Sequence, residues 1–189
     1  MDQRELLAYS IDVLERIGIP YMIVGSIASG AYGEPRLTQD IDIVIVPSLD
    51  QVRGLCAAFP HDDYYVSVEA ALRAAKTPGA QFNVLHPESG NKIDFMIARS
   101  DTWGKEQISR RQRIRMLPGH EAFAACPEDI IISKMLYYQE GGSEKHVRDI
   151  AGILKISSTM VDREYVARWA ESLGLGDVWK AILGRVGSS

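Results

Sequence analysis

Cysteine is scarce in this sequence of 189 residues, which contains only Cys56 and Cys126. Two cysteines so far apart form neither a disulfide framework nor a zinc site, and the four histidines also lack the spacing of zinc ligands. No Ser/His/Asp catalytic set can be justified from the sequence. We therefore expect both thiols to be buried and reduced, as in a cytoplasmic protein.

Long apolar runs and an excess of positive charge are also missing. No run is long enough to span a bilayer, and the first residues contain no apolar signal core. The formal net charge of −4 argues against a generally basic nucleic-acid-binding surface. With 46% hydrophobic residues the chain can still bury a sizeable core. These features predict a soluble cytoplasmic protein without a membrane partner.

The sequence does contain a pair of aspartates inside an apolar run. Asp40 and Asp42 flank Ile41 and precede residues 43–46, which are all apolar. In a strand, side chains two positions apart point to the same face, so the two carboxylates are expected side by side. Adjacent carboxylates repel each other and are costly to desolvate, and a divalent cation such as Mg2+ is the usual reason for the arrangement. The pair predicts a metal-dependent phosphoryl-transfer site.

A third aspartate, Asp94, lies in another apolar run, residues 92–98. Residues 81–86 alternate weakly and are followed by the turn-forming residues 87–91, which predicts a hairpin of two strands. If the second strand lies beside that of the aspartate pair, Asp94 could bind a second metal ion and act on the attacking hydroxyl. The structural alternative is that Asp94 caps the hairpin or pairs with Lys92.

Residues suited to holding phosphates lie just before the aspartate pair. Gly25 would let the backbone approach a phosphate closely, and the Ser26 hydroxyl and the following amides could bind its oxygens. Arg36 and Thr38 can reach the same phosphates, with Arg36 the better bidentate partner. Gly25 and Ser26 alone could be only a turn. Their co-occurrence with three aspartates, in this order, favours the functional interpretation.

The order of predicted elements indicates an α+β protein. Helices are expected at 3–17, 27–32, 48–59 and 69–75, and strands at 21–24, 40–46, 81–86, 92–98 and 113–117. The composition changes after Pro118, and further helices are expected at 127–139, 144–154, 162–172 and 175–186. We therefore predict a catalytic domain at residues 1–118 and a C-terminal helical domain at residues 119–189.

These motifs together resemble the DNA polymerase β-like nucleotidyltransferase superfamily. The resemblance rests on Gly25-Ser26, on Asp40 and Asp42 on a strand further along, and on a distant third aspartate on another strand. The longer stretch of residues 24–42 is similar to the branch that contains the AbiEii-like abortive-infection toxins. The resemblance implies a mixed β-sheet flanked by helices, with an NTP and Mg2+, two ions, bound beside the aspartate pair.

The same resemblance extends to the third carboxylate and to the helical half. Asp94 matches the third carboxylate of the superfamily. Lys134 resembles a lysine that contacts the triphosphate, and Arg148-Asp149 resembles a basic residue followed by aspartate in that branch. The implied setting is a toxin–antitoxin pair, with a cognate antitoxin as a partner.

The predicted function is a Mg2+-dependent nucleotidyltransferase that moves an NMP from an NTP to a hydroxyl and releases pyrophosphate. The acceptor is left open among an RNA end, a protein and a small molecule. One alternative is a catalytically silent module that binds a nucleotide or partner on the same fold; another is a different metal-dependent phosphotransferase or hydrolase. The basic stretch 105–115 is either a solvated face or a patch for RNA or phosphate.

Overall fold

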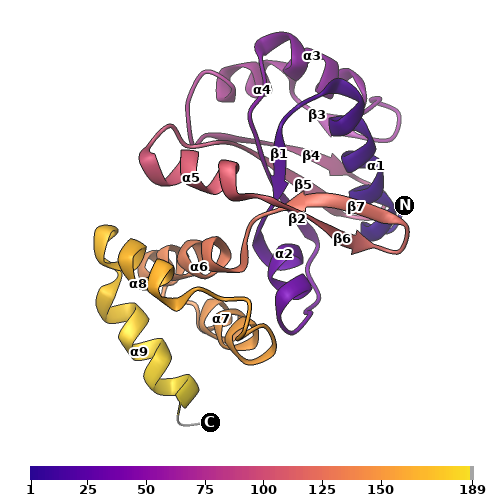
Figure 1. Ribbon diagram of the computed structural model, residues 1–189. Helices are drawn as coiled ribbons and strands as arrows, with labels where there is room; N and C mark the ends of the chain where they lie inside the picture. The colour runs from indigo at the N-terminus through magenta and orange to yellow at the C-terminus, as the bar shows by residue number, and fades with distance from the viewer. Residues whose placement is uncertain (188–189) are drawn as a thin grey trace. The chain divides into compact units, whose positions relative to one another are not determined.

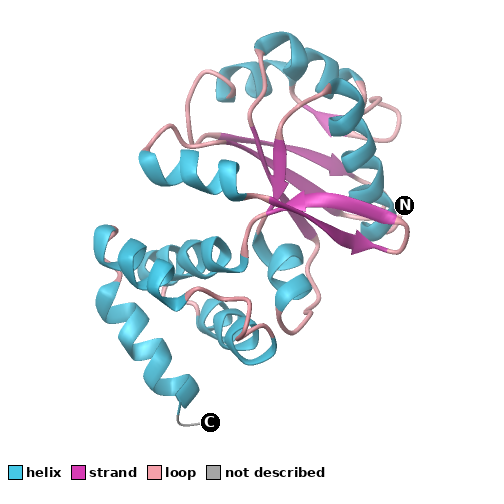
Figure 2. Ribbon diagram, in the orientation of Figure 1, coloured by secondary structure: helices cyan, strands magenta, loops and turns pink. Residues whose placement is uncertain are grey.

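The computed structural model describes residues 1–187 and shows an α+β architecture of strands and helices (Figures 1 and 2). The chain forms two compact units. The first unit contains residues 1–24 and 37–125, and the second contains residues 25–36 together with the chain from residue 126 onward. The chain therefore leaves the first unit after its first strand, returns before its second strand, and leaves it again after residue 125.

The first unit is a mixed β-sheet with helices. Its elements are α1 (Gln3–Ile17), β1 (Tyr21–Ile23), β2 (Asp40–Ile45), α3 (Leu49–Ala57), β3 (Tyr65–Val66), α4 (Val68–Ala74), β4 (Gln81–His86), β5 (Asn91–Ile97), α5 (Thr102–Arg110), β6 (Gln112–Leu117) and β7 (His120–Ala124). The seven strands are ordered β3-β4-β5-β2-β1-β7-β6. β2 is parallel to β5 and antiparallel to β1, while β4 and β5 form the predicted antiparallel hairpin. The predicted mixed sheet is confirmed.

Apolar and other residues alternate along β2 and β5, and this alternation decides which face of the sheet is buried. Ile41, Ile43 and Ile45 on β2 have no exposed surface, and neither have Ile93 and Phe95 on β5. Burying side chains of this size stabilises the fold by about 1.5–3 kcal/mol each. The residues between them point to the opposite face. A slip of one residue would bury charged side chains in place of apolar ones, so the register is strongly specified.

Capping residues set the ends of the helices in this unit. The Asp2 side chain accepts from the Glu5 N–H at 2.9 Å, and the Glu5 side chain accepts from the Asp2 N–H at 2.7 Å. The same reciprocal arrangement of Ser48 and Gln51 begins α3. Gly18 ends α1 with a φ of 73°, a left-handed conformation that favours glycine. These ends agree with the predicted helices.

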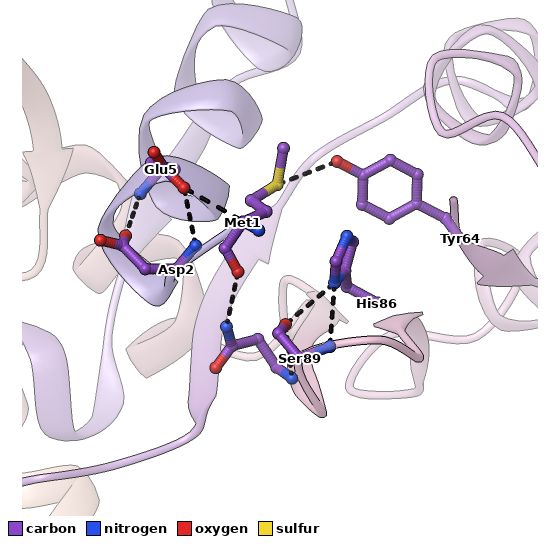
Figure 3. Close-up of polar contacts among 7 residues, drawn as sticks. Met1, Asp2, Glu5, Tyr64, His86 and Ser89 are labelled. Atoms are coloured by element: carbon purple, nitrogen blue, oxygen red, sulfur yellow. Dashed lines mark hydrogen bonds and ion pairs between the residues drawn. The ribbon is translucent and has the colours of Figure 1, made fainter. Parts of the chain in front are cut away.

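The N-terminus of α1 is joined to the β4–β5 hairpin by polar contacts (Figure 3). The Tyr64 hydroxyl donates to the Met1 sulfur at 3.1 Å, and the Asn91 side chain donates to the Met1 carbonyl at 3.3 Å. At the turn, buried His86 hydrogen-bonds through Nδ1 to the Ser89 hydroxyl at 2.9 Å. The start of β5 is therefore tied to both the turn and α1.

The second unit is helical. Its elements are α2 (Gly25–Tyr32), α6 (Pro127–Gly141), α7 (Glu144–Ile156), α8 (Arg163–Ser172) and α9 (Gly176–Gly187). α2 packs against α6 and α7. A Cβ at Gly33 would lie 2.8 Å from the backbone nitrogen of Ile153, so only glycine allows this approach of the loop to α7. The Ser157 hydroxyl donates to the Tyr32 carbonyl at 2.5 Å and closes the same contact.

The structure corrects two predictions about elements. α2 begins at Gly25, whereas the sequence predicted a turn there and a helix from residue 27. The strand β7 was missed, and the predicted last strand, β6, is followed by it. Pro118 and Gly119 form the turn between these two strands. Gly119 has a φ of 79°, a left-handed conformation that favours glycine. The four predicted helices between residues 127 and 186 are confirmed.

The observed units also differ from the predicted division into residues 1–118 and 119–189. Residues 119–125 contain β7, which pairs with β1 and β6 and so belongs to the sheet. Residues 25–36 belong to the helical unit although sheet strands precede and follow them in sequence. The last two residues of the predicted helical domain, 188–189, lie outside the described residues. Among residues 1–187, no helix is both long and apolar enough to cross a membrane.

Candidate active site

The sheet places the predicted carboxylates on one face through strand register. β2 and β5 run parallel, with Asp40 opposite Lys92 and Asp42 opposite Asp94. Positions two apart on a strand share a face, and paired positions on adjacent strands do too. All four charged side chains therefore leave the same face of the sheet, opposite the buried isoleucines. The hypothesis that the strand of Asp94 lies beside that of the aspartate pair is confirmed.

Lys92 lies between two of these carboxylates. Its ammonium is 2.9 Å from Oδ2 of Asp94 and 3.4 Å from Oδ1 of Asp40. The Asp94 side chain is 12% exposed and that of Asp40 is 53% exposed, so the ion pair to Asp94 is better shielded from solvent. The contact with Asp94 raises the pKa of the Lys92 ammonium against the opposing effect of burial. From the sequence, this pairing is the structural alternative to a metal-binding role for Asp94.

The second oxygen of Asp94 lacks a hydrogen-bond partner. Oδ1 is buried, and none of the described residues donates to it. Leaving a buried acceptor unsatisfied costs about 1–3 kcal/mol, and more for a charged group. A divalent cation is a partner that carboxylate oxygens accept. The carboxylates therefore fit a bound Mg2+. Binding the ion would give the buried Oδ1 of Asp94 the partner that it lacks.

The three carboxylates do not converge on one point as they stand. Among residues 1–187, no three Asp, Glu, His or Cys side chains are grouped as ligands for a single ion. The Lys92 ammonium lies between Asp40 and Asp94 and pairs with both carboxylates. Metal binding by Asp40, Asp42 and Asp94 stays a prediction.

Thr38 and Val24 shape the backbone around the aspartate pair. The Asp40 N–H donates to the Thr38 hydroxyl at 3.3 Å, and the Thr38 carbonyl accepts from the Gln3 side chain at 2.7 Å. The Val24 N–H donates to the carbonyl of Asp42 at 2.9 Å. Thr38 is thus used to position the start of β2, and its predicted contact with phosphate stays a prediction.

In the second unit, four predicted or neighbouring polar residues form a connected cluster. Arg36 donates to the Ser26 hydroxyl, and its Nε lies 3.3 Å from each carboxylate oxygen of Asp149. Lys134 donates to Oδ2 of Asp149 at 2.6 Å. We refer to Ser26, Arg36, Lys134 and Asp149 as the helical cluster. Gly25 begins the helix that carries Ser26, with a φ of 65° that favours glycine.

Asp149 is a site residue that the predicted set did not contain. It is 8% exposed and Lys134 is 3% exposed, so the pair is held away from water. The sequence signal was the resemblance of Arg148-Asp149 to a motif, but the partner of Asp149 could not be read from it. The lysine predicted to contact a triphosphate therefore donates to a carboxylate, and two cations share that one carboxylate.

Two arginines of the basic stretch 105–115 contact neighbouring elements of the first unit. Arg113 lies 3.6 Å from Glu15 and 3.6 Å from Glu121, and the guanidinium of Arg111 lies 4.8 Å from the centre of the Phe123 ring. These contacts join β6 to its neighbours. They support the interpretation of this stretch as a solvated structural face.

Comparison with solved structures identifies the fold. The antibiotic-resistance factor ANT(2'')-Ia matches with a TM-score of 0.60 and 16% identity, covering 100% of this chain and 97% of the other. The lincosamide antibiotic adenylyltransferase LnuA matches with a TM-score of 0.55 and 15% identity, covering 82% and 98% of the two chains. An antigenic nucleotidyltransferase-like protein from Paracoccidioides brasiliensis matches with a TM-score of 0.53 and 20% identity, covering 96% and 94%.

The chain has a nucleotidyltransferase fold. The fold implied by the sequence resemblance is thereby confirmed. No family model matches this chain. No curated protein matches it either. Membership of the superfamily and of its AbiEii-like branch stays a prediction.

Proposed function

We propose that this protein is a Mg2+-dependent nucleotidyltransferase that moves an NMP from an NTP to a hydroxyl of an acceptor. The observation that carries the proposal is the register of β2 and β5, which sets Asp42 opposite Asp94 on one face of a nucleotidyltransferase fold. Asp94 in addition keeps one buried oxygen without a hydrogen-bond donor. A module that only bound a partner would have no use for this costly arrangement.

Asp40, Asp42 and Asp94 are the residues that would hold Mg2+. The ion, when bound, neutralises phosphate charge and polarises the phosphoryl group. Asp94 has a second role, in which its carboxylate accepts the proton of the acceptor hydroxyl. Lys92 pairs with Oδ2 of Asp94 and so fixes the orientation of that carboxylate. General-base catalysis of this kind contributes roughly 10²–10⁴-fold in rate.

The reaction balances without a further reactant. The hydroxyl oxygen of the acceptor forms a bond to the α-phosphorus as its O–H bond breaks. The bond from the α-phosphorus to the bridging oxygen of the β-phosphate breaks, and its electron pair leaves with pyrophosphate. The proton goes to Asp94. No covalent intermediate with the protein is needed, because positioning and electrostatic stabilisation supply the catalysis.

The helical cluster is proposed to bind the phosphates of the NTP. Arg36 and Lys134 each carry a positive charge, and Asp149 holds both side chains in one place. Arg36 also orients the Ser26 hydroxyl. A partly exposed guanidinium suits bidentate binding of phosphate oxygens. Gly25 allows backbone amides at the start of α2 to approach the same group.

The acceptor is proposed to be a hydroxyl of a small molecule, an RNA end or a protein. One solved structure with this fold contains adenylyl-2''-tobramycin, and the LnuA structure contains lincomycin. These ligands support a small-molecule acceptor as the first class to test. The toxin role and its antitoxin partner rest on the resemblance of residues 24–42. Growth of cultures that express the wild type, compared with growth of cultures that express Asp42→Ala, tests the toxin role.

A transfer assay tests the activity. The protein is incubated with each radiolabelled NTP, Mg2+ and either an antibiotic panel or a cell extract, and labelled products are separated. We expect label in an acceptor, and at least about 100-fold less with Asp42→Asn or Asp94→Asn. Asp50→Asn, which changes an exposed aspartate on α3, is the matched control and should transfer normally. Mg2+-dependent NTP binding without transfer to any acceptor would favour the silent binding module.

A further inference from the structure

Two stacked rings lie about one helical turn from the Lys134–Asp149 ion pair of the helical cluster. The ring centres of Tyr137 on α6 and His146 on α7 are 5.7 Å apart, and the ring planes are 30° from parallel. Tyr137 follows Lys134 by three residues, and His146 precedes Asp149 by three. Residues three apart on a helix lie on the same side of it, so both contacts belong to one interface between the two helices. We refer to Tyr137 and His146 as the ring pair.

The ring pair reaches solvent beside a buried ion pair. Tyr137 is 50% exposed although it stacks on His146, whereas Lys134 is 3% exposed and Asp149 is 8% exposed. A tyrosine ring stabilises a structure mainly by removing its apolar surface from water, so a half-exposed ring leaves part of that gain unused. The exposed part of Tyr137 can therefore bury against a second flat ring.

His146 contributes a ring rather than a charge to the pair. Burial, and then the positive charge of Lys134, lower the pKa of His146 below its ordinary value of 6.5, so the imidazole is neutral at physiological pH. Its Nδ1 is buried, and none of the described residues hydrogen-bonds to it. The imidazole therefore acts through its face, as a support for Tyr137, and leaves the binding of anions to Arg36 and Lys134.

A nucleotide has both of the parts that this side of the helical unit can hold. Its base is a flat ring that stacks on aromatic side chains, and one ribose joins the base to the phosphates. Three residues advance a helix by about 4.5 Å, so Tyr137 follows Lys134 at a distance that a ribose can span. The base and the phosphates can therefore contact the ring pair and the helical cluster at the same time.

We propose that Tyr137, supported by His146, stacks on the base of the NTP whose phosphates bind to the helical cluster. This proposal rests on the proposed nucleotidyl transfer and adds the base to the contacts of the NTP. Every base presents a π face, so stacking alone discriminates little among NTPs. The ring pair then serves to hold the nucleotide, and its removal weakens nucleotide binding without changing the binding of phosphates alone.

Comparing a nucleotide with inorganic tripolyphosphate isolates the contribution of the base. Isothermal titration calorimetry with the full-length chain and Mg2+ measures the binding of tripolyphosphate and of the α,β-methylene analogues of ATP and CTP, which cannot release pyrophosphate. Tyr137→Ala removes the ring, and Tyr137→Leu removes it while keeping apolar volume should the alanine variant not fold. Tyr137→Phe and His146→Phe keep both rings. Tyr65→Ala, at a tyrosine of β3 that is 64% exposed, is the matched control, and circular dichroism confirms folding.

The wild type is expected to bind both analogues more tightly than tripolyphosphate. Tyr137→Ala and Tyr137→Leu should lose roughly 5–150-fold in affinity for the analogues, the effect of one stacked base, and should bind tripolyphosphate as the wild type does. Tyr137→Phe, His146→Phe and Tyr65→Ala should match the wild type. Analogues that bind to the wild type no more tightly than tripolyphosphate, or equally tightly to the wild type and Tyr137→Ala, would overturn the proposal.

The transfer assay on the same preparations separates this proposal from the proposed function. Transfer by the wild type, with nucleotide affinity unchanged in Tyr137→Ala, rejects the role of the ring pair and leaves the proposed function standing. Nucleotide binding that depends on Tyr137, without transfer to any acceptor, rejects the proposed function and supports the stacking contact.

Discussion

Asp149 shows at the level of a single residue how a buried carboxylate organises its surroundings. It accepts from Lys134 at 2.6 Å and from Arg36 at 3.3 Å, and it is 8% exposed. Two long cationic side chains are thereby held beside the same carboxylate. By holding both, Asp149 prepares them for an anionic ligand at a lower entropic cost on binding.

Replacing Asp149 by Asn should destabilise the protein strongly. Lys134 would keep its charge inside the protein after losing the carboxylate to which it donates, and breaking a buried pair in this way costs about 3–5 kcal/mol. The free energy of unfolding from urea denaturation measures the effect. Glu171→Gln, which breaks an exposed pair with Lys180, is the control and should cost no more than about 1 kcal/mol. Equal losses in the two variants would show that Asp149 is not a buried organising group.

His146 should give the helical unit a pH-dependent stability. Burial, and then the nearby charge of Lys134, lower the pKa of His146 below its ordinary value of 6.5. The unfolded chain therefore takes up this proton at a higher pH than the folded chain, so the contribution is present above pH 6.5 and is lost as the pH falls through the folded-state pKa.

The stability difference between wild type and His146→Phe measures this contribution. Phenylalanine keeps a ring against Tyr137, whose ring centre lies 5.7 Å from that of His146, but it cannot titrate. From about pH 7.5 to about pH 5, urea denaturation should show the wild type losing free energy of unfolding relative to the variant. A constant difference over this range would contradict the assigned pKa direction.

Residue patterns predicted the charged face of the sheet but not its partners. Asp40, Asp42 and Asp94 were identified because aspartates inside apolar runs are costly to desolvate unless they have a functional role. Lys92 received only a structural role in the sequence analysis, since its place between two strands follows from pairing across the sheet. Asp149 was missed as a site residue for the same reason, because its partners come from segments far away in the sequence.

At the scale of elements, α2 depends on a close approach to α7. A Cβ at Gly33 would lie 2.8 Å from the Ile153 nitrogen and 3.0 Å from the Gly152 carbonyl carbon, both of which are backbone atoms. Backbone atoms cannot move aside as a flexible side chain can. The loop that ends α2 and leads to Arg36 is therefore held by a contact that admits no side chain.

Gly33→Ala should loosen this contact and destabilise the protein by about 1–3 kcal/mol, the usual cost of overpacking. Gly141→Ala is the matched control, because a Cβ there meets nothing within 4 Å, and alanine at that helical position should be neutral or stabilising by up to about 1 kcal/mol. Thermal unfolding of the two variants compares them. A stable Gly33→Ala protein would mean that α2 and α7 do not pack this closely.

Elements with strong local signals were predicted well. α1 and α3 have capping residues and apolar periodicity, and β2 and β5 have alternating burial, so their positions follow from short stretches of sequence. β7 is short and carries Glu121 and His120, and only its pairing with β1 and β6 makes it a strand. Gly25 begins a helix that its own sequence does not favour, since glycine and serine are poor helix formers.

At the scale of the whole molecule, the chain interleaves two units. Residues 25–36 fold with the helices, although strands of the sheet precede and follow them. A prediction that divides a sequence into consecutive domains has no way to detect this, because the packing of α2 on α6 and α7 is a contact between distant segments. The sheet unit contains Asp40, Asp42 and Asp94, and the helical unit contains Ser26, Arg36 and Lys134.

The position of the label in the NTP tests the central claim, nucleotidyl transfer, most directly. The protein is supplied with Mg2+, an acceptor found in the transfer assay, and NTP labelled at either the α- or the γ-phosphate. We predict that the α-label appears in the acceptor, that the γ-label appears in pyrophosphate, and that both signals are lost in Asp42→Asn. Label from the γ-phosphate in the acceptor, or released as inorganic phosphate, would contradict the account and indicate a phosphotransferase or a hydrolase.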